Sequence, residues 1–381
     1  MQYCLFKPFF FPQVAVNLSN IKFGMIDKDI TLASTPTGDF YLSEAQYSAI
    51  KELVFAKSWQ MIGDENDYAE NGYLYPVDFM KGCLDEPLLM SIDANGDAKL
   101  VSNVCTHRGF ILITEKTKSS IIRCRYHGRC FQPDGKFSSM PEFEEAQNFP
   151  TRMDDLSMVH LQKFGGLYFA SLFPEMDLTQ LLSGITNRIP WFPWDKLKLK
   201  KDLSKDYIIN ANWALYCDNY LEGFHIPFVH KSLNKVIDYG SYETHLFDYS
   251  NLQLGIAKEG ELIFDLPQNS PDFGKKVAAY YYWVFPNMMF NFYPWGLSLN
   301  IIRPQGKDKT IVSFITYVFD ENKYNTGAGS DLNTVEMEDE EVVESVHRGL
   351  HSRLYFRGRY SPKMEKGVHH FHSLLMQFLQ K

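Results

Sequence analysis

The sequence predicts an α+β protein of two domains, a small antiparallel β domain followed by a larger strand-rich region with helices. Its length of 381 residues exceeds the usual size of a single domain. Residues 60–160 alternate short apolar runs with Gly, Pro, Asn and Asp turns, which is typical of short antiparallel strands. Residues 206–320 contain longer β-branched and aromatic runs, and the chain beyond residue 336 has the apolar spacing of helices.

One helix is expected before the small β domain. Residues 43–59 carry apolar side chains at helical spacing, and Ser43 is a candidate N-cap. The strands expected after this helix include residues 74–79, 87–93, 99–104 and 121–126. The Pro-Asp-Gly sequence at 133–135 predicts a tight turn between strands of the same domain.

The larger region is expected to begin with a strand segment at 206–217 that runs into a helix near 216–226. Residues 310–320 have the β propensity of a central strand, and residues 336–354 predict a long helix with acidic residues early and basic residues late. Ser361-Pro362 is expected to open a final helix. Further strands are expected at 278–294 and 297–304, and a polar loop at 321–333.

The N-terminal residues 1–16 are apolar, but Lys7, Pro8 and Pro12 interrupt them. They lack the charged first part of a signal peptide and are too short to span a bilayer. We expect a surface-packed strand or an unstructured tail, with translation from Met25 as the alternative, so whether residues 1–24 belong to the native protein stays open. No other stretch approaches the apolar length of a membrane helix.

Composition excludes some function classes. The net charge of −8 argues against nucleic acid, which requires a basic face. Aromatic residues make up 15% of the chain, which indicates large cores or an aromatic-lined pocket. The six cysteines show no disulfide framework spacing, so a reducing compartment and a cytoplasmic location are expected.

Two Cys-His pairs form the first chemical motif. Cys105 and His107 are separated by one residue, and Cys124 and His127 by two. A structural zinc site is the alternative, but zinc fingers usually combine a Cys-x-x-Cys pair with a pair of histidines. One thiolate and one imidazole from each loop suit a [2Fe–2S] centre in which two Cys hold one iron and two His hold the other. A glycine after each His lets the backbone approach the cluster sulfurs.

A second motif lies at 217–230, where Glu222, His225 and His230 are spaced by three and five residues. On a helix Glu222 and His225 would share a face, and Pro227 allows the two histidines to converge. Two His and one distant carboxylate form the facial triad of non-haem Fe(II) oxygenases. The alternative is that His225 and His230 are ordinary helix-end histidines. The candidate carboxylates downstream are Glu336, Glu338, Asp339, Glu340, Glu341 and Glu344.

Together these motifs resemble the alpha subunits of Rieske non-haem iron oxygenases, the aromatic-ring-hydroxylating dioxygenase family. The matching patterns are Cys-x-His-Arg-Gly, Cys-x-Tyr-His-Gly and Asn-x-x-Glu-x-x-His-x4-His. Arg129 departs from the family, where many members have Trp after His-Gly. The C-terminal VHRGLHSRLYFRGRYSP and HHFHSLL are most similar to the choline monooxygenase and carnitine oxygenase branch.

The resemblance implies a domain plan and site roles. Residues 1–44 would pack on the catalytic domain, 45–165 would form the Rieske domain, and 166–381 a helix-grip (START-like) catalytic domain with an antiparallel sheet. Asp339, five residues before Glu344, would be the third iron ligand, with Glu341 next. Glu222 would accept hydrogen bonds from a cluster His and an iron-binding His and so couple the centres, with Asp218 as its rival. Asn219 would lie near the iron.

The resemblance also implies cofactors and partners. A separate reductase, using NADH or NADPH through flavin, would supply electrons to the [2Fe–2S] cluster, and these would pass to a mononuclear Fe(II) in the neighbouring subunit of a homotrimer. Oxygen would then be used to hydroxylate a small substrate, with C–N cleavage in the ammonium-acting members. The alternatives are an aromatic-ring dioxygenase alpha subunit and a non-catalytic Rieske electron carrier.

Aromatic residues at 280–295 offer a candidate substrate pocket. Ring faces hold a quaternary ammonium group well, and Trp283, Phe285, Tyr293 and Trp295 are candidates. The alternative is that these aromatics are ordinary core residues of strands. The histidines at 369, 370 and 372 are expected to serve packing or to lie on the surface of the last helix.

Overall fold

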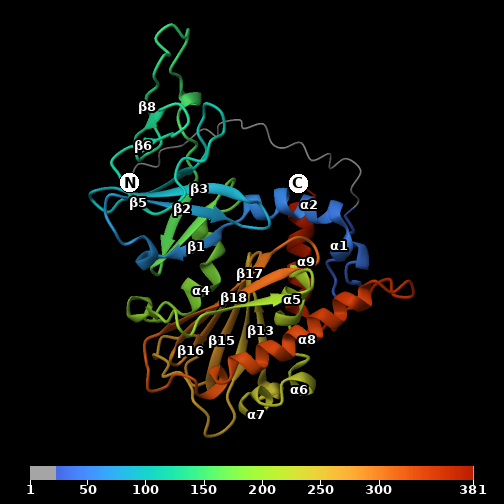
Figure 1. Ribbon diagram of the computed structural model, residues 1–381. Helices are drawn as coiled ribbons and strands as arrows, with labels where there is room; N and C mark the ends of the chain where they lie inside the picture. Colours follow the sequence, from blue (N-terminus) through green and yellow to red (C-terminus); the bar gives the residue numbers. More distant parts are fainter. Residues whose placement is uncertain (1–22, 381) are drawn as a thin grey trace.

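The computed structural model describes residues 23–380 (Figure 1). The expectation for residues 1–16 therefore lies outside the described residues. The same holds for residues 1–22 in the question of a translation start at Met25. The predicted α+β class is confirmed, because separate antiparallel sheets and long helices make up the chain. Among the described helices, none combines the length and the apolar character needed to cross a bilayer.

The first helices of the described residues are α1 (Gly38–Leu42) and α2 (Glu44–Leu53). The Ser43 side chain accepts a hydrogen bond from the backbone N–H of Gln46, as its predicted role as N-cap requires. The helix expected to reach residue 59 ends at Leu53, because a 3-10 turn at Phe55–Lys57 follows and directs Phe55 into the core.

Strands β1 to β10 form three small antiparallel sheets; the antiparallel strands predicted for residues 60–160 are present, and the first sheet extends beyond that range to Ser171. The first contains β1 (Gln60–Asp64), β9 (His160–Phe164) and β10 (Leu167–Ser171). The second has the order β4 (Ala98–Ser102), β3 (Glu86–Ile92), β2 (Tyr73–Phe79), β5 (Thr117–Lys118). The third is β6 (Ile122–Arg123), β7 (Cys130–Phe131), β8 (Phe137–Ser139). The expected domain boundary at 165/166 falls in the turn of the β9–β10 hairpin, and the domain division stays a prediction.

The larger region is built on an eight-stranded antiparallel sheet in the order β11-β18-β17-β16-β15-β14-β13, with β12 also paired to β18. β18 has partners along both edges, so the central strand predicted at 310–320 is confirmed. The strands are β11 (Lys198–Leu199), β12 (Lys205–Ile209), β13 (Glu243–Leu246), β14 (Ser250–Ile256), β15 (Val277–Val284), β16 (Met288–Tyr293), β17 (Gly296–Pro304) and β18 (Thr310–Val318).

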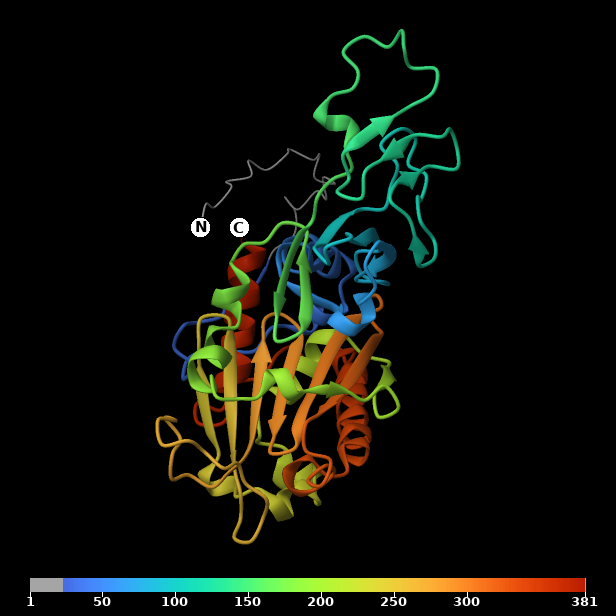
Figure 2. The same ribbon diagram turned by 90° about the vertical axis from the view of Figure 1, so that its left-hand side faces the viewer.

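Helices cover this sheet, and α8 runs across it as the helix-grip arrangement requires (Figures 1 and 2). The helices are α3 (Leu178–Leu181), α4 (Ser183–Arg188), α5 (Trp213–Tyr220), α6 (Ile226–Val229), α7 (Leu233–Val236), α8 (Leu332–Leu350) and α9 (Lys366–Leu379). The final helix begins five residues beyond Ser361 rather than at it. The long helix starts at Leu332, earlier than predicted, and ends at Leu350.

The helix predicted near 216–226 is wrong in its bounds. α5 begins at Trp213 and ends at Tyr220, and residues 221–225 form a turn. Gly223 permits this turn, because a Cβ at that position would lie 2.8 Å from the ring of Tyr242. Pro227 occupies the first turn of α6, where its missing N–H is tolerated. Glu222 and His225 are therefore brought together by a turn and not by a shared helix face.

The described N-terminal segment lies against the C-terminal part of the chain. The Arg359 guanidinium donates to the carbonyl of Ala33 at 2.8 Å, and the ring of His369 lies 2.7 Å from the carbonyl oxygen of Asp27. His372 is buried between the hydroxyl groups of Tyr41 and Tyr360. The expected packing role of the C-terminal histidines is thus confirmed for His369 and His372.

Candidate metal centres

The two Cys-His loops have the same backbone hydrogen bonds. In the first, the N–H of Cys105 donates to the carbonyl of Phe110, and the N–H of Gly109 to that of Cys105. In the second loop, the N–H of Cys124 donates to the carbonyl of Arg129, and the N–H of Gly128 donates to that of Cys124. Gly109 and Gly128 have φ angles of 71° and 77°, a conformation that favours glycine. The matching pattern positions one thiol and one imidazole per loop in equivalent places.

The donor set of these loops fits a [2Fe–2S] cluster with mixed ligands. Cys105 and Cys124 are buried in one apolar cluster, while the rings of His107 and His127 lie toward solvent with centroids 4.9 Å apart. The Nδ1 atom of His107 is buried and has no hydrogen-bond partner among the described residues, as expected of a ligand atom. Burial, followed by the charges of His127 and two arginines, lowers the pKa of His107 and keeps its imidazole neutral for ligation.

Arg129, the departure from the family pattern, is buried beneath the second loop with 2% of its surface exposed. Its guanidinium lies 2.7 Å from the Asp154 carboxylate and 4.9 Å from the ring centroid of Phe137. Asp154 in turn accepts from the backbone N–H of Thr151. The cation is therefore paired and enclosed by aromatic rings, so Arg129 acts as a structural support for the loop that carries His127.

Replacing Arg129 by Met is expected to destabilise the small domain by about 2–3 kcal/mol, because the Asp154 carboxylate would lose its cation. Urea unfolding followed by the loss of the visible cluster absorption measures this change. Arg125→Met is the matched control, because Arg125 is exposed in the same loop and should change stability by less than about 0.5 kcal/mol. Equal effects of the two substitutions would contradict a supporting role for Arg129.

The second constellation converges at the junction of α5, α6 and α8. The Nε2 atoms of His225 and His230 lie 3.0 Å apart, and Oδ1 of Asp339 lies 3.0 Å from Nε2 of His230 and 3.6 Å from Nε2 of His225. The ligand atoms of this triplet all lie within 4.8 Å of one another. Two imidazoles and a carboxylate in this arrangement can hold one transition-metal ion and leave coordination positions free.

Polar neighbours orient each member of the triplet. Oε1 of Glu222 lies 2.7 Å from Nδ1 of His225, and Oε2 of Glu338 lies 2.8 Å from Nδ1 of His230. The Asn219 side-chain amide donates to Oδ1 of Asp339 at 2.5 Å. Carboxylates that hold the Nδ1 side of a histidine leave Nε2 free to bind a metal. The role of Glu338 as such a partner was missed by the sequence analysis, which considered it only as a ligand.

The electrostatics of the triplet favour a cation. Burial by itself would lower the pKa of His230, but the hydrogen bonds and charges of Asp339 and Glu338 raise it overall. Negative charge thus converges on the two imidazoles from Glu222, Glu338 and Asp339. A bound metal ion would take the place of the proton that these carboxylates favour.

Glu341 and Glu344, two of the other candidates for the third ligand, lie elsewhere. Glu341 is exposed, and Glu344 accepts hydrogen bonds from the backbone and side chain of Asn210. Asp218, the rival of Glu222, accepts from the hydroxyl of Tyr41 and lies 2.9 Å from the ring of His372. The structure therefore gathers His225, His230 and Asp339 with Glu222 and Asn219. Glu344 and Asp218 make other contacts, and Glu341 faces solvent.

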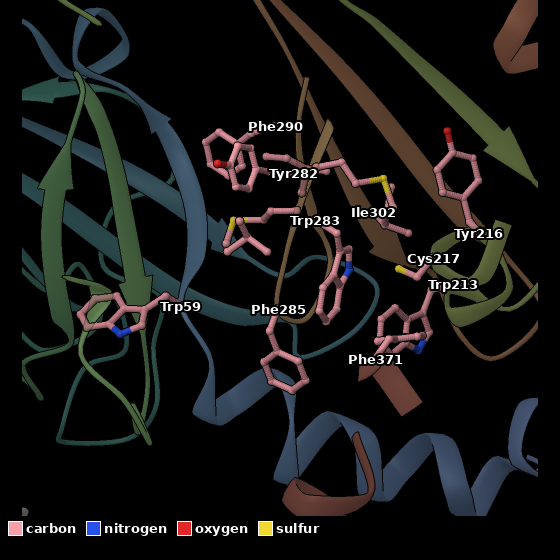
Figure 3. Close-up of a cluster of buried hydrophobic side chains, with 14 of the residues drawn as sticks. Trp59, Trp213, Tyr216, Cys217, Tyr282, Trp283, Phe285, Phe290, Ile302 and Phe371 are labelled. Atoms are coloured by element: carbon pink, nitrogen blue, oxygen red, sulfur yellow. The ribbon is translucent and has the colours of Figure 1, made fainter. Parts of the chain in front are cut away.

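A pocket of about 100 Å³ adjoins the triplet. Of the predicted aromatic residues, Tyr293 lines it, whereas Trp283, Phe285 and Trp295 do not. Figure 3 shows Trp283 and Phe285 in the buried core, and the ring of Trp283 lies 5.2 Å from that of Phe371 on α9. For these three residues the alternative expectation, that they are ordinary core residues, is confirmed, because the strand ends that carry them lie against helices or loops rather than against the pocket.

The aromatic lining comes mainly from residues that the sequence analysis did not select. They are Tyr216, Tyr220, Tyr242 and Tyr281. The available signal was the presence of polar residues in the middle of apolar strands. Asn291 on β16 pairs with Ser298 on β17 and with Tyr281 on β15. These three side chains share one face of the sheet and line the pocket.

The two constellations lie far apart within one chain. Figure 1 shows the cluster loops near β6 at one end of the molecule and α6 at the other, and Figure 2 shows the same separation from the side. Exposed aromatic residues lie beside each, with Tyr126 54% exposed in the second cluster loop and Phe228 78% exposed in α6.

Comparison with known families matches both regions. Residues 58–150 match the Rieske [2Fe-2S] domain, and residues 197–381 match the ring hydroxylating alpha subunit (catalytic domain). A chloroplastic choline monooxygenase from Arabidopsis thaliana is 30% identical over 363 residues, covering 90% of this chain and 82% of the relative. The carnitine monooxygenase oxygenase subunit of Escherichia coli (strain K12) is 27% identical over 355 residues, covering 89% and 92%.

Solved structures share the fold at lower identity. The quaternary ammonium Rieske monooxygenase CntA in complex with L-carnitine aligns with a TM-score of 0.69 at 23% identity, covering 92% of this chain and 97% of that one. A naphthalene 1,2-dioxygenase from Rhodococcus sp. aligns with a TM-score of 0.68 at 19% identity, covering 91% and 94%. Both belong to enzymes that combine a Rieske domain with a catalytic domain.

Proposed function

Because this chain belongs to the family of Rieske-type ring-hydroxylating oxygenase alpha subunits, we propose that it hydroxylates a quaternary ammonium compound, with loss of an aldehyde by C–N cleavage. The relatives named choline and carnitine monooxygenase support the substrate class. The observation that carries the enzymatic function is the convergence of His225, His230 and Asp339 beside a pocket lined by tyrosines. The same convergence argues against a non-catalytic electron carrier, which would need no such triplet.

We assign the residues of the two centres as follows. Cys105, His107, Cys124 and His127 would hold the Rieske cluster, and His225, His230 and Asp339 would hold the mononuclear iron. When bound, the two centres supply electrons and oxygen activation. Asn219 would orient Asp339, with which it shares a hydrogen bond, and Glu222 and Glu338 would orient the two imidazoles.

A homotrimer with head-to-tail contacts is proposed as the functional assembly. The cluster loops and the triplet lie at opposite ends of one chain, so electrons would have to cross to a neighbouring copy. The exposed Tyr126 and Phe228 lie beside the two sites and would be covered in such a contact. The surfaces in a head-to-tail contact differ, and a closed ring of such contacts has cyclic symmetry. A separate reductase using NAD(P)H and flavin would supply the electrons.

The proposal is tested by metal content and turnover. The purified protein is expected to hold about three irons per chain, two in the cluster and one in the triplet. With a compatible reductase, choline or carnitine should cause coupled oxidation of the reduced nicotinamide and release an aldehyde product. Absence of product with choline, carnitine and betaines, in a preparation that holds full iron and oxidises another substrate, would rule out the quaternary ammonium class.

A further inference from the structure

The pocket beside the triplet carries an unusual balance of charge. Three carboxyl groups line it, those of Glu222, Glu336 and Asp339, and no Lys or Arg is among the lining residues that the structure describes. Glu222 is paired with the ring of His225, and Asp339 with that of His230. The third carboxyl group, that of Glu336, has no cationic partner in the lining. Burial raises the pKa of Glu336, and the positive charge of the exposed Lys205, which lies outside the pocket, acts in the lowering direction. The ammonium group of Lys205 donates a hydrogen bond to the side chain of Asn333.

Glu336 is almost fully buried, with 1% of its surface exposed. Its Oε2 atom accepts a hydrogen bond from the hydroxyl of Tyr216, another lining residue, and its Oε1 atom has no partner within residues 23–380. Burying a carboxyl oxygen without a hydrogen-bond partner costs free energy. Because this oxygen lies in a pocket wall, we expect a bound ligand to supply the missing contact. Burial raises the pKa of Glu336 well above its usual range, and a cation against the carboxyl group acts in the opposite direction.

A second polar atom of the lining has the same character. The side-chain amide of Gln253 donates to the carbonyl of Tyr220, which orients its Oε1 atom away from that bond. This Oε1 atom is also buried without a partner among the described residues. The open positions on Glu336 and on Gln253 are hydrogen-bond acceptors, while the buried hydroxyl of Tyr281, a third lining atom without a partner in the described part of the chain, can donate or accept. A ligand that brings positive charge and a hydroxyl donor complements the acceptor oxygens of Glu336 and Gln253, whereas a ligand carboxylate would meet these oxygens with no Lys or Arg in the described lining to balance it.

We propose that Glu336 is the specificity-determining counter-charge of this pocket, which selects an amino-alcohol cation such as choline over a zwitterion such as carnitine. The inference rests on the proposed function and narrows its substrate class. A mononuclear Fe(II) repels a cationic substrate, and the Glu336 carboxylate offsets that repulsion. The ring faces of Tyr216, Tyr220, Tyr242, Tyr281 and Tyr293 would surround the methyl groups of the ammonium, since aromatic faces attract such cations.

Calorimetric binding to the iron-loaded protein under argon tests the inference without turnover. Three probes are compared: choline, its neutral isostere with carbon in place of nitrogen, and carnitine. The wild-type protein is expected to bind choline at least about tenfold more tightly than either of the others. Equal affinity for carnitine, or for the neutral isostere, would overturn the inference, and this comparison needs no variant.

Glu336→Gln keeps the shape of the side chain and removes its charge. Its affinity for choline is expected to fall about tenfold, while its affinity for the neutral isostere stays within about twofold. Glu341→Gln is the matched control on the exposed face of the same helix and should leave all three affinities unchanged. An unchanged preference for choline in Glu336→Gln would refute the role of Glu336.

The outcomes also separate this inference from the proposed function. If the protein binds quaternary ammonium compounds but has no preference for choline, the inference fails and the proposed function stands. If it binds neither choline nor carnitine and acts on another substrate class, both fail.

Discussion

Replacing Asp339 by Ala is expected to remove the mononuclear iron and lower turnover by more than about a hundredfold, since even the outer partners of metal ligands contribute 10–100-fold to affinity or activity. Oδ1 of Asp339 lies near Nε2 of both His225 and His230. Iron analysis should therefore fall from about three to about two atoms per chain, while the visible spectrum of the cluster is retained.

Glu341→Ala is the matched control for this prediction. It removes a carboxylate from the same helix two residues further on, where the side chain is exposed. Iron content and turnover should match those of the wild-type protein. Full iron in Asp339→Ala, or loss of iron in Glu341→Ala, would show that the third ligand has been assigned to the wrong residue.

Glu222→Gln is expected to keep all three irons and to lower coupled turnover by at least about a hundredfold. Oε1 of Glu222 already lies 2.7 Å from Nδ1 of His225, and Oε2 accepts from the backbone N–H of His225 at 3.1 Å. A carboxylate can accept from an imidazole on each side, but a glutamine amide has only one acceptor oxygen. The variant should therefore fail to couple the two centres across the proposed subunit contact.

A single-turnover measurement separates this effect from loss of metal. The cluster is reduced chemically, and its reoxidation is followed after oxygen and substrate are added. Reoxidation should be slow in Glu222→Gln and close to the wild-type rate in Asp218→Asn, because Asp218 contacts Tyr41 and His372 instead. A normal rate in Glu222→Gln would exclude a bridging role for this residue.

The four candidate cluster ligands could be selected from the sequence because all the information lies within two short loops. Cys105 and His107 share one turn of backbone with Gly109, and the second loop repeats this arrangement. A spacing of one or two residues fixes how far apart the donor atoms can be, whatever the rest of the chain does. The same holds for the strands at 297–304 and 310–320, whose β-branched and aromatic residues predict them locally.

The third carboxylate was harder to choose, because residues 336–344 contain several acidic candidates within about two helical turns. The buried positions Val343, His347 and Leu350 set the rotation of α8 against the rest of the domain. Continued backward at helical spacing, the same face includes Asp339 and Glu336 and leaves Glu341 in solvent. The periodicity was present in the sequence, but which side of the helix meets the histidines depends on packing.

The pocket depended most on tertiary structure. Tyr281 and Trp283 have the same parity on β15, yet Tyr281 lines the pocket and Trp283 packs against Phe371. The turn at 221–225 likewise replaced the expected helix, because Gly223 lies against Tyr242.

The sequence by itself determined the α+β class and selected the four candidate cluster ligands and the two histidines of the second site. The family resemblance favoured Asp339 as the third ligand, but only the tertiary structure showed that it meets those histidines, which tyrosines surround the pocket and where Glu336 lies. Ligand spacing and strand propensity are set by covalent neighbours, whereas the position along a strand at which a side chain meets a cavity or a helix is set by contacts between residues distant in the chain.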